Sequence, residues 1–441
     1  MSLKRKIFAC SLQIRLISSS IPSTRRGSNF YDLIGSPKFF AAPMVGQSDL
    51  AFRLLTKNHG TELAFTQMMH ARMFVEHASY RQEIDWRDYS PKARLPTAMK
   101  ISAKELDKNL IVQFAGDSAD TLVRAASLVQ SDDSVVAVDL NLGCPQNIAK
   151  RGHYGAYLLP EKELVVSILK AMVKNLDKPV CAKIRCLASA EETLEIAKAI
   201  QDTGVSLLTI HGRTIDSKKN YTGPADWEII RQVKQSLTIP IIANGGVSSY
   251  KDAINCLSFT GADGVMSSEC LLENPRLFSN TGSMIIEEDY IASQISVANE
   301  YLCLLRAYPV HHGSMPHVAR SHIFKMLYRL LDAPRNTDLR DRLALGSIAE
   351  MQSVLDDLTV RTAGYVSDGP AGIKRALEDG YLGPTLWYMR HRDSRAMQRM
   401  VSTPRTSGSM ASRASATDQQ QLKSRLLAVR AAREAHITAL P

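Results

Sequence analysis

The chain is predicted to be an α/β protein, a (β/α)8 TIM barrel followed by a smaller all-α helical domain. Short β-rich runs alternate with amphipathic stretches between residues 39 and 270. Near-continuous apolar strands that alternate with helices indicate a parallel sheet covered by helices. Eight such units in roughly 230 residues fit a closed barrel. An open, doubly wound sheet is the structural alternative, but it more often has fewer strands.

Eight β-rich runs are the expected strands, and each run ends in small or polar residues. They are residues 39–45, 62–68, 110–116, 135–140, 179–186, 206–213, 240–246 and 264–269. Helical periodicity over residues 122–129, 161–175 and 190–202 predicts three of the connecting helices. A long, charged segment at about residues 77–109 is expected to be an insertion between the second and third strands.

Composition divides the chain into four expected parts. They are a basic arm or targeting segment (1–34), the barrel (35–284), a helical domain (285–390) and a basic, disordered tail (391–441). The helical domain is expected because strand alternation is absent there and residues 317–331 have helical periodicity. The tail is rich in Ser, Arg and Gln, with nine Lys or Arg against three acids between Arg392 and Glu434, a composition typical of disorder.

The first residues of the chain are basic and free of acids. Residues 1–31 contain six Lys or Arg, many Ser and no Asp or Glu. This composition suits a mitochondrial presequence and equally suits a disordered basic arm. A cytoplasmic or nuclear location is therefore expected, with the mitochondrion as the open alternative.

The overall composition favours an anionic partner. The formal net charge is +10, which favours nucleic acid or phosphate, although ordinary solubility is an equal explanation. No run approaches the roughly 18 apolar residues that span a bilayer, so no membrane partner is expected. The seven cysteines are scattered, odd in number and form no C-x-x-C pair, which predicts a reducing compartment and no zinc site. We expect a monomer without a metal.

Candidate site residues follow the predicted strands. In a barrel of this kind the active site lies at the carboxyl ends of the strands. The side chains expected there are Pro43, Met44, Val45, Gln113, Asn141, Cys144, Lys183, Arg185, His211, Arg213, Asn244, Gly245, Gly246, Ser268 and Glu269.

Several of these residues have the chemistry of a pocket for flavin mononucleotide (FMN). The Gly245-Gly246 pair and Ser268 are small enough for a phosphate to approach the backbone, and the last two loops of a barrel often bind phosphate. Lys183 would point into the mouth, where a cation near N1 and O2 of a flavin stabilises the reduced ring. Taken singly, the glycines could form only a turn and Lys183 could be solvated.

The next strand end carries His211 and Arg213, which could add positive charge beside a phosphate. A lone histidine in such a position is more often a core residue with satisfied hydrogen bonds. Because most of the predicted strand ends contribute a polar group, chance is a weaker explanation for this pattern.

The strand at residues 135–140 is followed by an amide, Asn141, and a single thiol, Cys144. Two uses fit: a redox or acid thiol with an amide that orients a substrate, or a buried structural cysteine. An ordinary thiol has a pKa of about 8.5 and is therefore protonated at neutral pH, as a general acid must be. Lys150 and Arg151 follow closely and could bind the phosphates of an RNA.

The helical domain is locally basic as well. Its basic residues are His311, His312, His317, Arg320, His322, Lys325 and Arg329. RNA binding, a solvated helix face and a metal cluster are the three alternatives for this group.

Seven motifs carry a resemblance to a known family. They are Ala42-Pro43-Met44-Val45, Asn141-Leu142-Gly143-Cys144-Pro145-Gln146, Lys150-Arg151-Gly152-His153-Tyr154-Gly155, Lys183-Ile184-Arg185, His211-Gly212-Arg213-Thr214, Ala243-Asn244-Gly245-Gly246 and Asn274-Pro275. The set resembles the flavin-dependent tRNA-dihydrouridine synthases, in particular the eukaryotic branch that modifies D-loop positions 16/17. The similarity covers residues 35–278 and extends more loosely to about residue 335.

The resemblance implies an oxidoreductase that reduces the C5–C6 bond of D-loop uridines in tRNA, with FMN as cofactor and NADPH or NADH as reductant. It implies tRNA binding by the helical domain, Cys144 as the proton donor, and contacts from Asn141 and Arg185 to the target uracil. The implied FMN contacts are Pro43, Met44, Gln113, Lys183, His211, Asn244, Gly245, Gly246, Ser268 and Glu269.

The chain also departs from the family pattern. Gly46 stands where an acidic residue is expected, and Ser267-Ser268-Glu269 stands where many relatives have Gly-Arg. The insertion is longer than expected. Two rival functions stay open on the sequence: an FMN barrel that acts on a small molecule, and a non-catalytic RNA-binding protein on a barrel scaffold.

Overall fold

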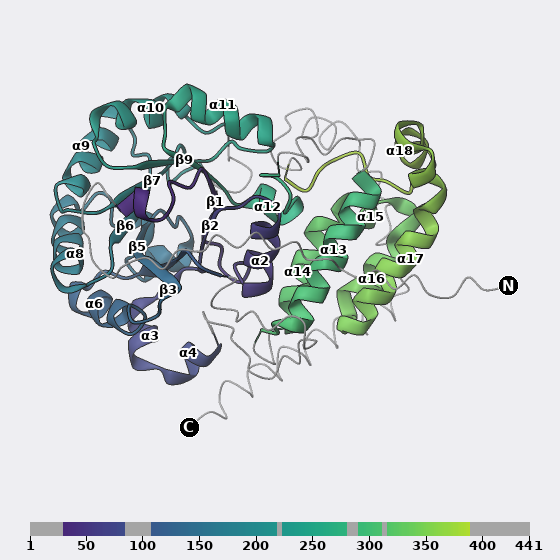
Figure 1. The fold of residues 1–441 in the computed structure, drawn as a ribbon, viewed down its shortest axis with the longest axis horizontal. Coiled ribbons are helices and arrows are strands. Elements are labelled where there is room, and N and C mark those ends of the chain that lie inside the picture. The colour runs from purple at the N-terminus through teal and green to yellow at the C-terminus, as the bar shows by residue number, and fades with distance from the viewer. Residues whose placement is uncertain (1–29, 84–106, 218–222, 280–289, 311–314, 389–441) are drawn as a thin grey trace, which may run out of the picture. The chain divides into compact units, whose positions relative to one another are not determined.

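A computed structural model describes residues 30–83, 107–217, 223–279, 290–310 and 315–388 (Figure 1). The basic arm up to residue 29, most of the expected insertion and the tail after residue 388 lie outside the described residues. Expectations about those segments stay predictions.

Eight parallel strands close into a barrel. They are β1 (Phe39–Ala41), β2 (Leu63–Phe65), β4 (Leu110–Ala115), β5 (Val135–Leu142), β6 (Val180–Arg185), β7 (Leu207–His211), β8 (Ile241–Asn244) and β9 (Gly264–Ser267). Each strand pairs with the next, and β1 pairs with β9, which closes the ring. The short β3 (Met69–His70) pairs with β4 at the rim. Each strand falls within one predicted run, or overlaps it closely, so the barrel prediction is confirmed.

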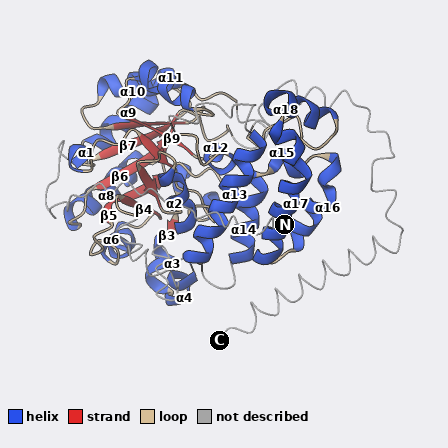
Figure 2. Ribbon diagram, turned by 45° about the vertical axis from the view of Figure 1, so that its right-hand side comes forward, coloured by secondary structure: helices blue, strands red, loops and turns tan. Residues whose placement is uncertain are grey.

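Helices surround the strands (Figure 2). They are α2 (Leu50–Asn58), α6 (Ala119–Ser127), α8 (Lys162–Asn175), α9 (Ala190–Gln201), α10 (Trp227–Ser236), α11 (Tyr250–Thr260) and α12 (Glu269–Glu273). Two short helices, α3 (Ala71–Glu76) and α4 (Ala78–Glu83), lead into the expected insertion. Local sequence explains the boundaries: Ser189 and Glu192 form a capping box at the start of α9, and Gly261 ends α11 in the left-handed conformation.

The barrel interior has an apolar layer and a polar layer. The apolar layer includes Ile111, Ala137, Cys181, Leu207 and Ile242, packed together with residues of α1 (Phe30–Leu33). Side chains two residues apart on a strand point to the same side. The inward positions one step closer to the carboxyl ends are therefore the polar residues Gln113, Asp139, Lys183, Thr209 and Asn244. All five are buried, so the barrel floor under the active-site end is polar.

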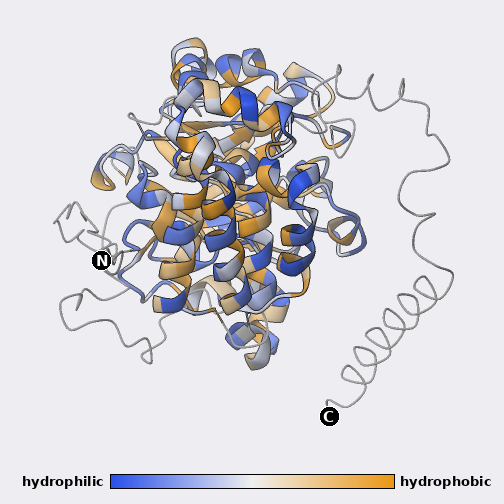
Figure 3. Cartoon of the chain, turned by 90° about the vertical axis from the view of Figure 1, so that its right-hand side faces the viewer, coloured by the Kyte–Doolittle hydropathy of each residue, from blue (hydrophilic) through white to orange (hydrophobic). Residues whose placement is uncertain are grey.

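The described residues after 289 form helices and no strands, as expected for the helical region. They are α13 (Tyr290–Ala307), α14 (Met315–Met326), α15 (Tyr328–Leu331), α16 (Thr337–Leu345), α17 (Ile348–Ser367) and α18 (Gly369–Glu378). The predicted helix over residues 317–331 is interrupted at Leu327, between α14 and α15. Hydrophobic and hydrophilic residues alternate around these helices (Figure 3), and the buried side chains join one core cluster with the barrel.

None of the described helices is both long enough and apolar enough to cross a bilayer. The described residues contain no group of three or more His, Cys, Asp or Glu side chains arranged to hold a metal ion.

Candidate active site

A chain of amide hydrogen bonds runs from the barrel floor to the loop that carries Cys144. Gln113 Nε2 donates to Asp139 Oδ2 at 2.8 Å, and Gln113 Oε1 accepts from Asn141 Nδ2 at 2.8 Å. Asn141 Oδ1 in turn accepts the backbone N–H groups of Gly143 at 3.1 Å and Cys144 at 3.0 Å. The side chain of Asn141 therefore sets the conformation of the Cys144 loop from below.

Lys183 belongs to the same floor, two strands away from Gln113. Its Nζ donates to Asn244 Oδ1 at 2.9 Å, and Asn244 Nδ2 donates to the backbone oxygen of Met266 at 3.0 Å. Burial and, to a smaller extent, the charge of Arg185 lower the pKa of Lys183 to about 8, while Asp139 and Cys144 oppose the shift. The ammonium is thus held in place by one amide.

Asp139 is a buried carboxyl group that the sequence did not single out. Burial raises its pKa to about 7, against the hydrogen bond from Gln113 and the charge of Lys183. Within the described part of the chain, Asp139 Oδ1 has no hydrogen-bond partner, and neither has the nearby buried hydroxyl of Thr209. These two oxygens lie under the site and leave hydrogen-bonding capacity unused.

Cys144 is half-buried at the rim. It packs with Tyr154, Tyr157 and Met68 in a small cluster beside the barrel. Lys183 and Arg185 are both within electrostatic range of Cys144, which places the thiol near two cations of the site.

Gly155 holds the Cys144 loop from the other side. It has φ +69°, and a Cβ at this position would lie 2.9 Å from Cys144 Cβ. Only glycine fits this close approach with a left-handed backbone.

Arg185 joins two loops across the site. Its Nε donates to the backbone oxygen of Gly143 at 2.8 Å and its Nη1 donates to that of Thr214 at 2.9 Å. Burial and the neighbouring Arg213 lower its pKa to about 10. Arg185 is therefore fixed between the loops after β5 and β7 and is charged at neutral pH.

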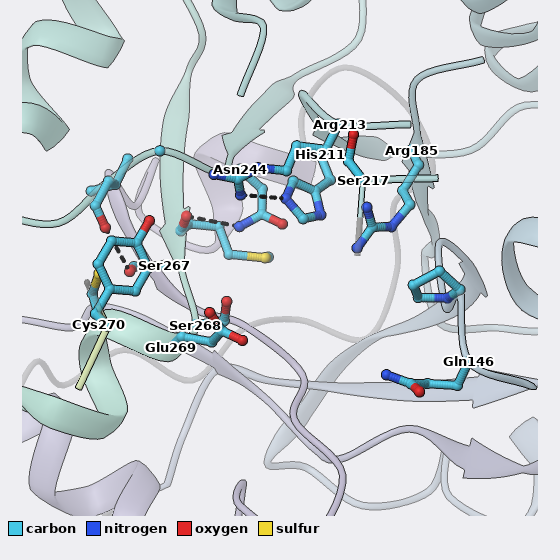
Figure 4. Close-up of a pocket in the computed structure, with 16 residues that line it drawn as sticks. Gln146, Arg185, His211, Arg213, Ser217, Asn244, Ser267, Ser268, Glu269 and Cys270 are labelled. Atoms are coloured by element: carbon cyan, nitrogen blue, oxygen red, sulfur yellow. Dashed lines mark hydrogen bonds between the residues drawn. The ribbon is translucent and has the colours of Figure 1, made fainter. Parts of the chain in front are cut away.

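A pocket opens at the carboxyl ends of β6 to β9. The predicted residues that line it are Arg185, His211, Arg213, Asn244, Gly245, Gly246, Ser268 and Glu269. In Figure 4, Arg185, His211 and Arg213 lie on one side, and Ser268 and Glu269 lie on the other. Ser267, which the sequence placed with Ser268 at the end of the last strand, also lines the pocket. The lining residues that were not among the candidates are Pro145, Gln146, Ser217, Val247, Met266, Cys270 and Tyr388.

The remaining predicted residues lie outside this lining. Gln113, Asn141, Cys144 and Lys183 are joined to it through the hydrogen bonds and charges described above. Pro43, Met44 and Val45 follow β1, and Val45 is 66% exposed. Lys150 and Arg151 are exposed on α7 (Asn147–Arg151), directly after the Cys144 loop.

Gly245 and Gly246 form a cradle that a side chain would fill. Both have positive φ, +103° and +78°, and a Cβ on Gly245 would lie 2.7 Å from the His211 ring. Trp227 Nε1 donates to the backbone oxygen of Gly245 at 2.9 Å and so fixes the turn. An arginine side chain can only donate hydrogen bonds. Because Arg213 Nη1 lies 3.2 Å from His211 Nε2, the Nε2 atom is the acceptor of this hydrogen bond. A small anionic group fits such a cradle, beside the two arginines that line the pocket.

The fold and the site together define a (β/α)8-barrel enzyme with a lysine-amide floor and a glycine cradle at the carboxyl end of the barrel. The dihydrouridine synthase (Dus) family matches residues 40–362. The chain belongs to this family, as the sequence motifs predicted.

Individual relatives are similar to most of this chain. A mouse protein named "tRNA-dihydrouridine(16/17) synthase [NAD(P)(+)]-like" is 36% identical over 344 residues, which are 78% of this chain and 66% of that protein. The tRNA-dihydrouridine(16/17) synthase [NAD(P)(+)] of Saccharomyces cerevisiae is 37% identical over 72% of this chain and 71% of its own length. Its Schizosaccharomyces pombe counterpart is 36% identical over 73% and 76%. The match thus spans just under two thirds of the mouse protein.

Several basic residues of the helical region contact other parts of the protein. His322 and Arg329 are buried: His322 Nε2 contacts Asp49 Oδ2 at 2.8 Å, and Arg329 Nε donates to the backbone oxygen of Gly383. Lys325 contacts Gln47 of the loop after β1 at 2.6 Å. These three side chains join the helical region to the barrel or to itself. His311 and His312 lie outside the described residues.

Proposed function

We propose that this protein is an FMN-dependent tRNA-dihydrouridine synthase that reduces the C5–C6 bond of D-loop uridines, at positions 16/17, with NADPH or NADH. Family membership and the names of the similar proteins support the reaction and the substrate. One structural observation carries the proposal: the Gln113–Asn141 hydrogen bond and the Lys183–Asn244 hydrogen bond bring the Cys144 loop and a buried ammonium to one rim.

FMN would occupy the pocket between the glycine cradle and the polar floor. Gly245, Gly246 and Ser268 offer backbone to its phosphate, with His211 beside them. Glu269 also lines this end; because a carboxylate repels phosphate, the contacts there are assigned to backbone groups.

The ring of the cofactor would lie over the floor. Gln113, Lys183 and Asn244 of the floor are assigned to the ring, and Pro43, Met44 and Val45, which follow β1, are assigned to it from the first loop. When bound, FMN would transfer to C6 of the uracil a hydride that originates from the nicotinamide cofactor. Lys183 is mostly protonated at pH 7 because its pKa of about 8 lies above that pH, so it offers a positive charge to the electron-rich edge of the ring.

Cys144 is assigned the proton for C5, so that the double bond gains one hydride and one proton. The thiol is half-buried, and its position is set by Asn141 from below and by Gly155 from the side. Arg185 is fixed by two backbone oxygens and is assigned to the uracil carbonyl groups. Asn141 Nδ2 has one N–H left for the base, because its other N–H donates to Gln113 Oε1, and its oxygen accepts from the loop.

The uridine must leave the stacked RNA to reach this rim. Lys150 and Arg151 are exposed on α7, directly after the Cys144 loop, and are assigned to the phosphates that flank the extruded uridine. Arg213 adds positive charge deeper in the pocket. The helical region is assigned to the body of the tRNA.

The test is reduction of an unmodified tRNA. Purified protein is incubated with FMN, NADPH and a tRNA transcript, and dihydrouridine is mapped by mass spectrometry at each D-loop position. The proposal expects protein-bound FMN and dihydrouridine at positions 16/17. Flavin-dependent turnover of small molecules without tRNA would favour the small-molecule rival. RNA binding by a protein that takes up no flavin would favour the non-catalytic rival.

A further inference from the structure

The pocket has one wall that does not come from the barrel. Tyr388 lines it, although this residue lies ten positions after Glu378, the last residue of α18. We call residues 383–388 the strap. Tyr388 is 9% exposed, so its side chain packs against the protein and does not project into solvent.

Glu273 holds the end of the strap. Its two carboxylate oxygens accept the backbone N–H groups of Trp387 and Tyr388, each at 2.9 Å. Glu273 is 2% exposed, and hydrogen bonds from N–H groups to a buried carboxylate are among the stronger ones in proteins. The position of Tyr388 is therefore tightly defined.

The beginning of the strap is anchored as well. Arg329 Nε donates to the backbone oxygen of Gly383 at 2.7 Å, and the N–H of Gly383 donates to the oxygen of Arg329 at 2.6 Å. Gln294 Nε2 donates to the backbone oxygens of Glu273 and Met326, at 2.8 Å each, and so ties the anchor of the strap to α13 and α14.

The anchor and the pocket belong to the same short helix. Helix α12 begins at Glu269, next to Ser268, and both residues line the pocket; it ends at Glu273, which binds the strap. The strap therefore reaches the pocket at the loop after β9. This is the end to which the phosphate is assigned, beside Gly245 and Gly246.

We propose that the strap closes the phosphate end of the flavin pocket, with the ring of Tyr388 as a wall and Glu273 as its positioning residue. The inference rests on the proposed function and assigns to this site a preference for a phosphorylated flavin over an unphosphorylated one. A ring that excludes water strengthens hydrogen bonds from backbone N–H groups to the phosphate, because the local dielectric falls. Loss of the ring weakens mainly those bonds.

The test is flavin affinity, measured without turnover. Apo-protein of the full chain is titrated with FMN and with riboflavin, and the quenching of flavin fluorescence gives each Kd. Tyr388→Ala is expected to weaken FMN about 10-fold and riboflavin by less than about 3-fold. Tyr388→Phe is expected to stay within about 2-fold of the unaltered chain for both, because it keeps the ring.

A second substitution covers the case in which Tyr388→Ala loosens the fold. Glu273→Gln keeps the ring but replaces one acceptor of the strap by an amide N–H group, so it is expected to weaken FMN about 3-fold and to speed its dissociation. The control is Tyr365→Ala, another tyrosine of the helical region. Its ring contacts that of Tyr381, neither residue lines the pocket, and the substitution is expected to leave both affinities unchanged.

The outcomes separate this inference from the proposed function. Unchanged FMN affinity in Tyr388→Ala, or an equal loss for FMN and riboflavin, would overturn the strap as a phosphate-end wall while the function stands. An unaltered chain that binds no FMN would overturn the proposed function and this inference with it.

Discussion

The side-chain oxygen of Asn141 accepts the backbone N–H of Cys144 at 3.0 Å, and the same oxygen also accepts Gly143. The side-chain amide of Asn141 thus sets the position of the loop that carries the Cys144 thiol. Asn141 is 8% exposed and is itself held by Gln113. The position of Cys144, the proposed proton donor, therefore depends on the side chain of Asn141.

Asn141→Ala is expected to lower turnover about 10- to 100-fold, because misplacement of a reacting group by about 1 Å has effects of this size. The measurement is the single-turnover rate of dihydrouridine formation. Asn141→Asp keeps an acceptor for the two N–H groups and loses the donor to Gln113, so a smaller loss is expected. Equal rates for the alanine variant and the unaltered chain would show that the loop does not need this amide.

Cys144→Ala is expected to reduce turnover about 100-fold or more, because removal of a general acid has effects of this size. FMN content and tRNA affinity are expected to stay unchanged, since the thiol is not assigned to either. Cys303→Ser, at an exposed free cysteine, is the control and is expected to be fully active. A normal dihydrouridine yield and rate from Cys144→Ala would refute the acid role.

The lowered pKa of Lys183 predicts that flavin affinity depends on pH. Its pKa is lowered to about 8 in the folded chain, so the ammonium loses its proton as the pH rises through that value. FMN affinity is therefore expected to fall about 10-fold between about pH 7 and pH 9.5, the effect of one hydrogen bond from a charged group. Lys183→Met is expected to bind FMN weakly with a flat pH profile over this range. Coincident profiles for the two proteins would rule out Lys183 as the titrating contact.

The raised pKa of Asp139 predicts that its contribution to stability falls as the pH rises, whereas that of most carboxyl groups rises with pH. Its pKa is raised from 3.8 to about 7 by burial, so between these values the folded chain holds a proton that the unfolded chain releases. The contribution of Asp139 to stability is therefore greatest at low pH and is lost as the pH rises toward 7.

Asp139→Asn removes this penalty and keeps an acceptor for Gln113. The melting temperature is expected to rise by a few degrees at pH 8 and much less at pH 4.5. The control, Asp120→Asn, changes a carboxyl group that is 80% exposed and is expected to shift neither value. A lower melting temperature for Asp139→Asn at pH 8 would mean that the carboxylate is needed as the partner of Lys183.

The strands and most floor residues could be predicted because they follow simple periodic rules. Apolar runs that end in polar residues predicted the barrel, and side chains at the strand ends predicted Gln113, Lys183 and Asn244. Asp139 was missed although a carboxyl inside an apolar run is a readable signal. The reason is that it lies before the strand end, where sequence alone cannot separate floor from rim.

Other parts of the site depend on contacts that no local pattern records. Tyr388 reaches the pocket because Glu273 binds its backbone, 115 residues earlier in the chain. The inward orientation of His322 depends on Asp49, 273 residues away in the sequence, and that of Arg329 depends on Gly383, 54 residues away. Charge counts predicted a basic helical region but could not say which cations are used inside the fold.

Lys150 and Arg151 therefore are the better test of RNA binding than the buried cations of the helical region. Both are exposed on α7 and neither is part of the pocket lining. Lys150→Glu and Arg151→Glu are each expected to weaken tRNA binding and to reduce the slope of log affinity against log salt concentration by about 1, because each removes about one phosphate contact. Lys251→Glu, an exposed lysine on α11, is the control with the same charge change and is expected to keep the slope. Binding is measured over a series of salt concentrations with a fluorescent tRNA. If all three variants shift affinity equally, the effect is net charge alone and α7 has no specific contact with the phosphates.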